Sequence, residues 1–315
     1  MARLFERVLV TGATGFIGRA LVGRLVSEGV EVECLIRSSS TRRAELERLA
    51  PSHVLALEAL DAEPLTKAIG KRSFDAVFHL ASYGVNPSER DLRLMLHGNV
   101  DLTANLVQAL AGAPPKRFVF TGSCSEYAPS EPGVYLREDV PTRPDSVYGA
   151  AKLAASAIGS ALGQKLGVPF VALRLFGVYG PGEAPDRLIP YVVRHLHAGT
   201  RPDLTAGEQQ RDLTHVDDVV EGLLLAASAP NVEPHDVYNL CSGTPRRIRD
   251  VAEAVADAVG KPRAELDLGA RPYRSDEAMW IVGDPQKFRE AAGYTPKRDF
   301  EAGVRDTVGR TASGR

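Results

Sequence analysis

The sequence contains few of the residues from which metal sites and disulfide frameworks are built. Its 315 residues include only three cysteines, Cys34, Cys124 and Cys241, which are odd in number and far apart. No two Cys or His residues show the spacing of zinc ligands, so we expect no metal, and His195 and His197 fit better as residues of a helix. Isolated cysteines of this kind are typical of small core side chains in a reducing compartment.

Excess charge and long apolar runs are also missing. The 38 Lys and Arg residues nearly balance 40 Asp and Glu residues, giving a formal net charge of −2, so neither nucleic acid nor an acidic membrane is an expected partner. The longest apolar runs are too short to span a membrane, and the N-terminus lacks a signal-peptide pattern. We therefore expect a cytoplasmic protein, long enough for a large α/β core and a smaller lobe.

A glycine-rich turn near the N-terminus predicts a dinucleotide site. Residues 7–11 read as a buried strand and residues 19–28 as an amphipathic helix, and between them lies the pattern Gly-x-x-Gly-x-x-Gly. Glycine permits a tight turn and a close approach to a pyrophosphate, whose charge a helix N-terminus stabilises. A plain glycine turn is the alternative. The expected cofactor contacts here are Gly12, Thr14, Gly15, Phe16, Ile17 and Gly18.

The end of the second strand predicts NADP(H) rather than NAD(H). NAD-binding chains usually place an acidic residue there for the ribose hydroxyls, whereas an Arg accommodates the additional phosphate of NADP. Here residues 31–36 are followed by Arg37 and Ser38, and no acid lies between them and the basic pair at 42–43. The alternative is a solvated basic loop without a ligand.

Strand-like and helical segments alternate through the first half of the chain. Strands are expected at 7–11, 31–36, 53–57, 74–80, 116–121 and 169–175, and helices at 41–49, 61–70, 88–111 and 146–166. Such alternation predicts an α/β fold with a Rossmann-type doubly wound parallel sheet. Ligands of these sheets bind at the carboxyl ends of the strands. At those ends the sequence places Thr11, Arg37, Ala81, Ser123 and Phe176.

The regular alternation of strands and helices ends after residue 176. This change predicts a smaller α/β substrate-binding lobe on the C-terminal side. A turn at 179–182 precedes a helix at 186–198, and a helix at 216–228 with a strand at 236–240 returns to the sheet. From 244 onward we expect shorter helices and loops. The predicted domains are 1–176 plus 212–243 for the dinucleotide and 177–211 plus 244–309 for the substrate, with 310–315 as a frayed tail.

Tyr148 and Lys152 lie four residues apart in a helical segment, so both side chains face the same side of the helix. An ammonium beside a phenol favours phenolate and lowers a pKa that is about 10 in water. A phenol tuned in this way can exchange a proton with a carbonyl or alcohol oxygen. The alternative is an ordinary contact on an exposed helix face. A hydride transfer also needs a donor that polarises the carbonyl, and Ser123 after the fifth strand can supply it.

These motifs together resemble the extended short-chain dehydrogenase/reductase family. The likeness is carried by the glycine turn, His79-Leu-Ala-Ser82, Asn99, Ser123 and Tyr148-x-x-x-Lys152, in this order. Segments 174–182 and 207–218 resemble the branch that modifies nucleotide sugars. The resemblance implies that Ser123 binds the reacting oxygen, that Tyr148 is the acid/base, and that Lys152 lowers its pKa and holds the nicotinamide ribose. It also implies that Asn99 supports the site through a water.

The same resemblance implies further contacts with cofactor and substrate. Asp61 would receive the adenine amino group, unless it is only a helix N-cap. Arg211 and Arg274 would grip the substrate diphosphate, with Arg271 as an alternative to Arg274 and a plain surface arginine as the alternative to either. The other implied cofactor contacts are Ala62, Leu80, Ala81, Ser82, Tyr148 and Lys152. The other implied substrate contacts are Ser82, Ser123, Cys124, Ser125 and Gly177.

Departures from the family pattern reduce the number of family reactions that this chain is expected to catalyse. Sugar 4,6-dehydratases resembling this chain carry Thr-Asp-Glu where it has Ser123-Cys124-Ser125, and Glu126 is one residue too late and would point away from the site in an extended segment. Many 4-epimerases have Asn where this chain has Gly177. The pattern from 122 to 127 resembles reductases of 4-keto-6-deoxy nucleotide sugars.

We therefore expect NADPH-dependent reduction of the 4-keto group of a nucleotide-linked 4-keto-6-deoxyhexose. The alternative within enzymes is a nucleotide-sugar 4-epimerase with bound NAD. A third possibility is an NADP-binding sensor on the same fold. A sensor would not need all of Ser123, Tyr148 and Lys152, so their presence argues against it.

Small residues along the catalytic helix predict a homodimer. Related enzymes pair this helix, 146–166, with the helix at 88–111 across a two-fold axis, and small side chains permit close approach. The alternative is that the small residues pack only against the chain's own sheet. They are Gly149, Ala150, Ala151, Ala154, Ala155, Ala157, Gly159 and Ala161.

Overall fold

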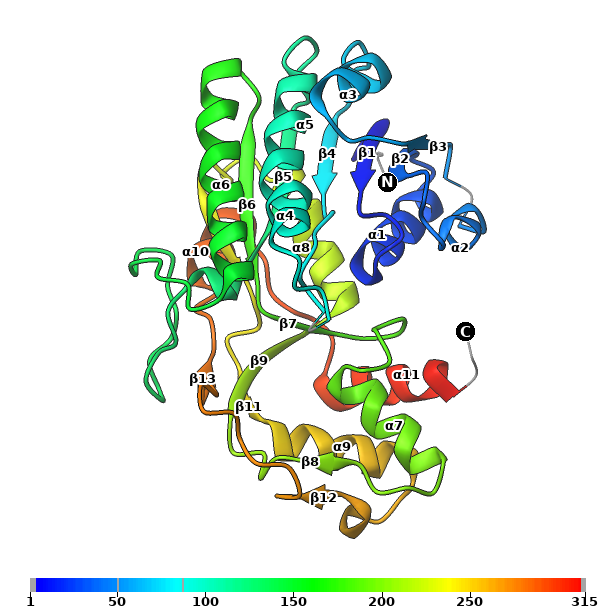
Figure 1. The fold of residues 1–315 in the computed structure, drawn as a ribbon, viewed down its shortest axis with the longest axis vertical. Coiled ribbons are helices and arrows are strands. Elements are labelled where there is room, and N and C mark those ends of the chain that lie inside the picture. Colours follow the sequence, from blue (N-terminus) through cyan, green and yellow to red (C-terminus); the bar gives the residue numbers. More distant parts are fainter. Residues whose placement is uncertain (1–3, 50, 87, 313–315) are drawn as a thin grey trace.

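The computed structural model describes residues 4–49, 51–86 and 88–312, which form a large sheet domain and a smaller lobe (Figure 1). The large sheet has seven strands in the order β10-β6-β5-β4-β1-β2-β3, and every neighbouring pair is parallel. The α/β fold class is therefore confirmed. Its strands are β1 (Arg7–Thr11), β2 (Glu31–Arg37), β3 (His53–Leu57), β4 (Ala76–His79), β5 (Arg117–Ser123), β6 (Phe170–Leu175) and β10 (Val237–Leu240).

Helices cover both faces of this sheet because its strands are apolar on both sides. Val8 and Val10 of β1 belong to one buried cluster and Leu9 to another, as expected from the alternation of side chains along a strand. The first cluster includes α1 (Phe16–Ser27) and α8 (Val216–Ser228). The second includes α3 (Ala62–Ile69), α5 (Leu102–Leu110) and α6 (Val147–Leu166).

Two helices differ from their expected form. The segment expected as one helix at 88–111 is divided into α4 (Leu92–Met95), a π-helical turn η1 (Leu96–Asp101) and α5. Asn99 lies inside the π-helical turn, a kind of irregularity that is frequent at functional sites. The helix expected at 41–49 is shorter, as α2 (Arg43–Glu47).

The smaller lobe has its own sheet and its own core. One sheet contains β7 (Gly177–Tyr179), β9 (Gln210–His215), β11 (Pro245–Arg247) and β13 (Trp280–Ile281), and β8 (Asp203–Leu204) pairs with β12 (Asp267–Leu268). The core includes Val192, Val255 and Val304. These come from α7 (Leu188–His197), α9 (Ile248–Val259) and α11 (Phe300–Ala312). His195 and His197 lie in α7.

The structure shifts the predicted domain boundaries. Strand β9 pairs with β7, β11 and β13, so residues 212–215 belong to the smaller lobe and the chain returns to the large domain only at Val216. Helix α10 (Gln286–Ala292) belongs to the large domain instead, because Phe288 and Tyr294 enter its core. The frayed-tail prediction is wrong for 310–312, which are helical in α11, and 313–315 lie outside the described residues.

Within the described ranges, no helix is long and apolar enough to cross a membrane.

Candidate active site

The carboxyl ends of the parallel strands face the smaller lobe (Figure 1). Their register places Thr11 beside His79 and Ser123 beside Leu175. The Thr11 hydroxyl and His79 Nδ1 are 2.6 Å apart, and burial lowers the His79 pKa to about 3, so the imidazole is neutral. This buried contact ties together the strand ends on which the glycine turn and Ser82 are mounted.

The glycine turn fits a dinucleotide pyrophosphate. Gly12 has a φ of +68°, and a Cβ there would lie 2.5 Å from the backbone of Leu80 and Ala81. A Cβ on Gly18 would lie 2.1 Å from the Gly12 carbonyl oxygen, so neither position accepts a side chain. Gly15 is the N-cap of α1 and has no side chain to cap it, and the first turn contains no acid. The backbone N–H groups at this helix end are therefore available to an anion.

The residues expected around the adenosine lie at neighbouring strand ends. Arg37 is exposed at the end of β2, and its guanidinium forms no ion pair with another residue of the described ranges, so it can receive a phosphate. The Ser38 amide donates to the Leu57 carbonyl oxygen at 2.8 Å. Asp61 occupies the N-cap position of α3 but its carboxylate makes no capping hydrogen bond, so helix capping does not occupy it. Ala62 begins that helix.

Asn99 hydrogen-bonds the segment after β4 through its side chain, and its expected role through a water stays a prediction. Its Oδ1 accepts a hydrogen bond from the Ser82 hydroxyl at 2.8 Å, and its Nδ2 donates to the carbonyl oxygens of Tyr83 and Met95, both at 2.8 Å. The fully buried amide therefore joins the π-helical turn to the end of β4. An interaction with the Ser82 hydroxyl also acts on Tyr148 and opposes the effect of burial on its pKa.

Tyr148 lies in the first turn of α6, whose N-cap Ser146 accepts from the Gly149 amide at 3.0 Å. Burial raises the pKa of Tyr148 to about 12, against the opposing effect of hydrogen bonds with Ser82 and Ser123. The ammonium of Lys152 lies 4.3 Å from the centre of the Phe120 ring, and burial lowers its pKa to about 8. Burial dominates the Tyr148 pKa in this structure, and the expected lowering by Lys152 stays a prediction.

The segment after β5 is a 3-10 turn, η2 (Cys124–Glu126), and not extended as predicted. The Ser123 hydroxyl accepts from the Ser125 amide at 3.1 Å, and Glu126 Oε1 accepts from the Ser123 amide at 2.8 Å. This reciprocal pair is a capping box, whose signature is Ser followed three residues later by Glu. The turn carries the Glu126 carboxylate to Arg174 Nε at 2.8 Å. Sequence reasoning missed this role, although the capping-box spacing is visible in the sequence.

Cys124, which follows Ser123, lies near Arg211 of the smaller lobe. The charge of Arg211 acts on the Cys124 thiol, but burial is the larger effect and raises the thiol pKa to about 11. The thiol is therefore neutral near pH 7 and cannot take the place of a carboxylate in acid–base catalysis. Ser125 follows in the same turn.

The two predicted diphosphate arginines share one carboxylate. Arg211 Nη2 and Arg274 Nε bind the two oxygens of Glu277 at 2.7 and 3.2 Å, so the structure brings Arg211 and Arg274 together. Arg271 is exposed, and its amide donates to the Leu204 carbonyl oxygen at 3.0 Å. Glu277 was also missed, because no sequence pattern links a loop residue to a strand 66 residues earlier.

Gly177 permits close strand packing. A Cβ at this position would lie 2.6 Å from the Asp212 carbonyl oxygen, so the neighbouring strand β9 leaves no room for a side chain. Asn, found here in many 4-epimerases resembling this chain, would require the strands to move apart.

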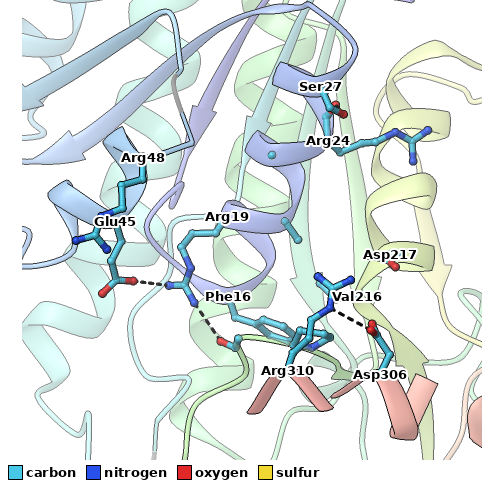
Figure 2. Close-up of a pocket in the computed structure, with 14 residues that line it drawn as sticks. Phe16, Arg19, Arg24, Ser27, Glu45, Arg48, Val216, Asp217, Asp306 and Arg310 are labelled. Carbon is cyan, nitrogen blue, oxygen red and sulfur yellow. Dashed lines mark hydrogen bonds and ion pairs between the residues drawn. The ribbon is translucent and has the colours of Figure 1, made fainter. Parts of the chain in front are cut away.

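A groove of about 1110 Å³ is lined by residues of α1, α8 and α11 and by the loop at Gly182 (Figure 2). Ser123 and Tyr148 are not among the residues that line it. Of the predicted site residues, Phe16 lines it. Arg19 crosses this groove, donating to the Thr14 carbonyl oxygen at 2.9 Å and to the Gly182 carbonyl oxygen at 3.1 Å. This guanidinium therefore connects the glycine turn of the large domain to the first loop of the smaller lobe.

Comparison with known proteins identifies the family. Residues 8–241 match the model of the NAD dependent epimerase/dehydratase family. The chain belongs to this family. A dTDP-6-deoxy-L-talose 4-dehydrogenase (NAD(P)(+)) of Kitasatospora kifunensis is 30% identical over 311 residues, which cover 95% of this chain and 94% of that protein. A UDP-glucose 4-epimerase of Streptomyces lividans is 29% identical over 316 residues, covering 95% and 94%.

Solved structures agree with this membership of the epimerase/dehydratase family. The structure of MoeE5 in complex with UDP-glucuronic acid and NAD is 29% identical, covers 98% of this chain and 100% of its own, and superposes with a TM-score of 0.83. The protein is thus an enzyme of the NAD(P)-dependent nucleotide-sugar branch, and the resemblance seen in its motifs is confirmed at the level of the family.

Proposed function

We propose that the protein reduces the 4-keto group of a nucleotide-linked 4-keto-6-deoxyhexose to the alcohol, using NADPH. The observation that carries the proposal is the turn after β5. It carries Ser123, a neutral Cys124 and Ser125, while the carboxylate of the same turn, Glu126, is bound to Arg174. The turn can thus assist proton transfer at an oxygen, but it offers no acid and base for eliminating water across carbons 5 and 6.

The residues of the site suit a reduction. A phenol whose pKa is about 12 remains protonated near pH 7, which is the form that donates a proton to the developing alkoxide at carbon 4. The Ser123 hydroxyl accepts from the Ser125 amide, so its own proton is free to polarise the carbonyl. Bound NADPH supplies the hydride that carbon 4 receives. Tyr148 supplies the proton, and Asn99 orients the phenol through Ser82.

Arg211 and Arg274 are the proposed diphosphate ligands. Planar guanidinium groups bind phosphate oxygens in pairs, and the shared Glu277 carboxylate holds the two groups together before substrate arrives. The triad of two cations and one anion retains a positive charge for the diphosphate. The NADPH preference is assigned to Arg37, exposed and without an ion pair among the described residues, at the end of β2.

The name of the Kitasatospora kifunensis relative describes oxidation at carbon 4 of a 6-deoxy nucleotide sugar, which is the reverse of the proposed reduction. A 4-epimerase remains the second candidate, favoured by the similarity to the Streptomyces lividans enzyme. Arg37 and the packed Gly177 count against it, because an epimerase retains NAD and many carry Asn at the latter position.

The deciding experiment is a screen of dTDP-, GDP-, CDP- and UDP-4-keto-6-deoxyhexoses with NADPH, with the products assigned by NMR. One of these sugars should be reduced with one NADPH consumed for each product molecule. Interconversion of 4-epimers without net consumption of NADPH would instead identify an epimerase. An enzyme that binds NADPH but turns over none of the sugars would support the sensor reading.

Dehydration should be absent. Offered a nucleotide hexose that retains its 6-hydroxyl, the enzyme should form no 4-keto-6-deoxy product, even with added NAD, because Cys124 and Ser125 replace the required carboxyls. The measurement is mass spectrometry for loss of water from the sugar. Detection of that product would show that Cys124 and Ser125 do not prevent dehydration.

We also propose that the protein is a homodimer through α6 and the α4–η1–α5 segment, which lie side by side (Figure 1). Gly149, Ala151, Ala155 and Gly159 are buried within the chain, so for them the alternative of packing against the chain's own elements holds. An apolar stripe with helical spacing remains on the outer face of α6. It consists of Val147, Ala150, Ala154, Ala157, Ile158 and Ala161.

The neighbouring segment presents apolar side chains as well. Leu92, Leu94 and Leu96 are 46–56% exposed, which is unusual for leucines on adjacent turns. Association of two copies about a two-fold axis would cover both sets at once.

A further inference from the structure

Glu126 is a fully buried carboxylate directly beneath the catalytic residues. Its Oε1 accepts the Ser123 amide at 2.8 Å and its Oε2 binds Arg174 Nε at 2.8 Å. The carboxylate also explains Gly122, since a Cβ there would lie 2.5 Å from Glu126 Oε1. The Ser123 amide, the Glu126 carboxylate and the Arg174 guanidinium are thus joined by two hydrogen bonds in the interior.

The guanidinium on the other side is itself held in place. Arg174 lies in β6 with its guanidinium carbon 4.4 Å from the centre of the Tyr127 ring. The Tyr127 hydroxyl donates to Asn239 Oδ1 at 2.8 Å, and the Asn239 amide group donates to the Leu136 carbonyl oxygen at 2.8 Å. The network therefore extends from the backbone amide of Ser123 to β10 without leaving the interior.

Lys152 faces few titratable groups. His79, at the end of β4, is neutral because burial lowers its pKa to about 3, and Tyr148, one turn earlier on α6, has a pKa of about 12 and is uncharged. Lys152 lies over Phe120 and Glu126 Oε1 packs against Gly122, and these two residues of β5 face the same side of the sheet. The Glu126 charge opposes the effect of burial on the Lys152 pKa and therefore favours the ammonium form. Phe120, on β5, contributes only its ring face.

We propose that Glu126 is a positioning residue, whose buried carboxylate orients Ser123 through its backbone and keeps the Lys152 side chain charged when the enzyme works. The inference rests on the proposed reduction, but its first test needs no substrate. A charged Lys152 is the form that can hold ribose hydroxyls and stabilise negative charge on Tyr148 as the phenol gives up its proton.

The first experiment is an NMR titration of the full-length protein with carbon-13 at lysine Cε, the Lys152 resonance being assigned with Lys152→Met. In Glu126→Gln the amide oxygen can still accept the Ser123 N–H, but the charge is lost. The Lys152 pKa should fall from about 8 to about 7, since a nearby opposite charge shifts a pKa by about 1 or more.

Glu138→Gln is the matched control. Glu138 is another largely buried carboxylate, and it also accepts a backbone amide, that of Asn239 at 2.7 Å. Its substitution should leave the Lys152 pKa unchanged. If Glu126→Gln strands the charge of Arg174 and does not fold, the double variant Glu126→Gln/Arg174→Gln removes both charges, and its Lys152 pKa should still lie below that of the wild type.

The second experiment is the pH dependence of kcat for the reduction. The descending limb should move to lower pH in Glu126→Gln by the same amount as the Lys152 pKa, and it should not move in Glu138→Gln. An unchanged Lys152 pKa, or a loss of activity that is equal at every pH, would overturn the proposal. Inactive wild type would refute the proposed reduction but leave the NMR result standing.

Discussion

Substitutions of Tyr148 and Ser123 should lower the rate of reduction by different amounts. Tyr148→Phe removes the proton donor and should lower kcat by roughly 100-fold or more, with NADPH affinity nearly unchanged. Ser123→Ala removes one carbonyl donor while the proton source remains, so its loss should be smaller. Steady-state kinetics and NADPH titration of both variants check this order. Substantial turnover by Tyr148→Phe would refute the assignment of the acid.

Arg37 should set the cofactor preference. With a guanidinium at the 2′-phosphate, the wild type should bind NADPH at least tenfold more tightly than NADH, which corresponds to about 1.4 kcal/mol. Arg37→Ala should remove most of this difference and leave the Kd for NADH nearly unchanged. The control is Arg43→Ala, whose guanidinium is bound to Glu47 at 2.8 Å. Equal affinities for the two cofactors in the wild type would contradict the prediction.

At the scale of elements, the outer face of α6 decides the assembly. Ala157 and Ala161 are exposed and lie about one and a half and about two and a half turns beyond Lys152. Ala157→Glu and Ala161→Glu should therefore dissociate the dimer before they disturb the chemistry. Light scattering at tens of micromolar provides the measurement. Ala44→Glu, on exposed α2, is a control of the same chemistry that should leave the dimer intact. A monomeric wild type would end the proposal.

The π-helical turn η1 shows how an element can serve a site. Asn99 bonds two backbone carbonyl oxygens and the Ser82 hydroxyl at once, which requires the amide to lie between the helix and the end of β4. A regular helix over 88–111, as the periodicity predicts, would carry the same residues at a different phase. The reason for the π-helical turn is apparent only in the tertiary structure, where η1 packs against the end of β4.

At the scale of the whole molecule, the two parts are connected by polar contacts as well as by the chain. Asp212 in β9 accepts from the amides of Ser242 and Gly243, both at 2.8 Å, where the chain leaves β10 for the smaller lobe. Arg19 forms a second connection, from the glycine turn to the loop at Gly182 (Figure 2). The glycine turn and the smaller lobe are therefore joined by a direct hydrogen-bonded contact.

Arg19→Ala should weaken this coupling. Loss of two hydrogen bonds from a partly exposed guanidinium should raise both the Kd for NADPH and the KM for the sugar by roughly fivefold, equivalent to about 1 kcal/mol. Fluorescence titration and steady-state kinetics provide the two constants. Arg24→Ala is the control, since Arg24 lines the same groove but pairs with Glu28 and Glu221. Equal effects of both substitutions would show that the groove, and not the Arg19 contact, is responsible.

Local patterns in the sequence determined the order of strands and helices, the glycine turn and the position of the Ser123, Tyr148 and Lys152 motifs. They could do so because a buried strand, a helix and a tight turn each constrain residues that are close in sequence. The site residues at strand ends were predictable for a related reason, because parallel strands place all their carboxyl ends on one edge.

Only the tertiary structure decided the contacts between residues far apart in the chain. The Glu126–Arg174 pair spans 48 residues, the Arg211–Glu277 pair 66, and the Arg19–Gly182 contact 163. The protonation of Tyr148 also depends on the tertiary structure. Burial raises its pKa, and burial is a property of the packed site and not of the spacing to Lys152. Composition and periodicity do not indicate which residues far apart in the chain contact and bury one another.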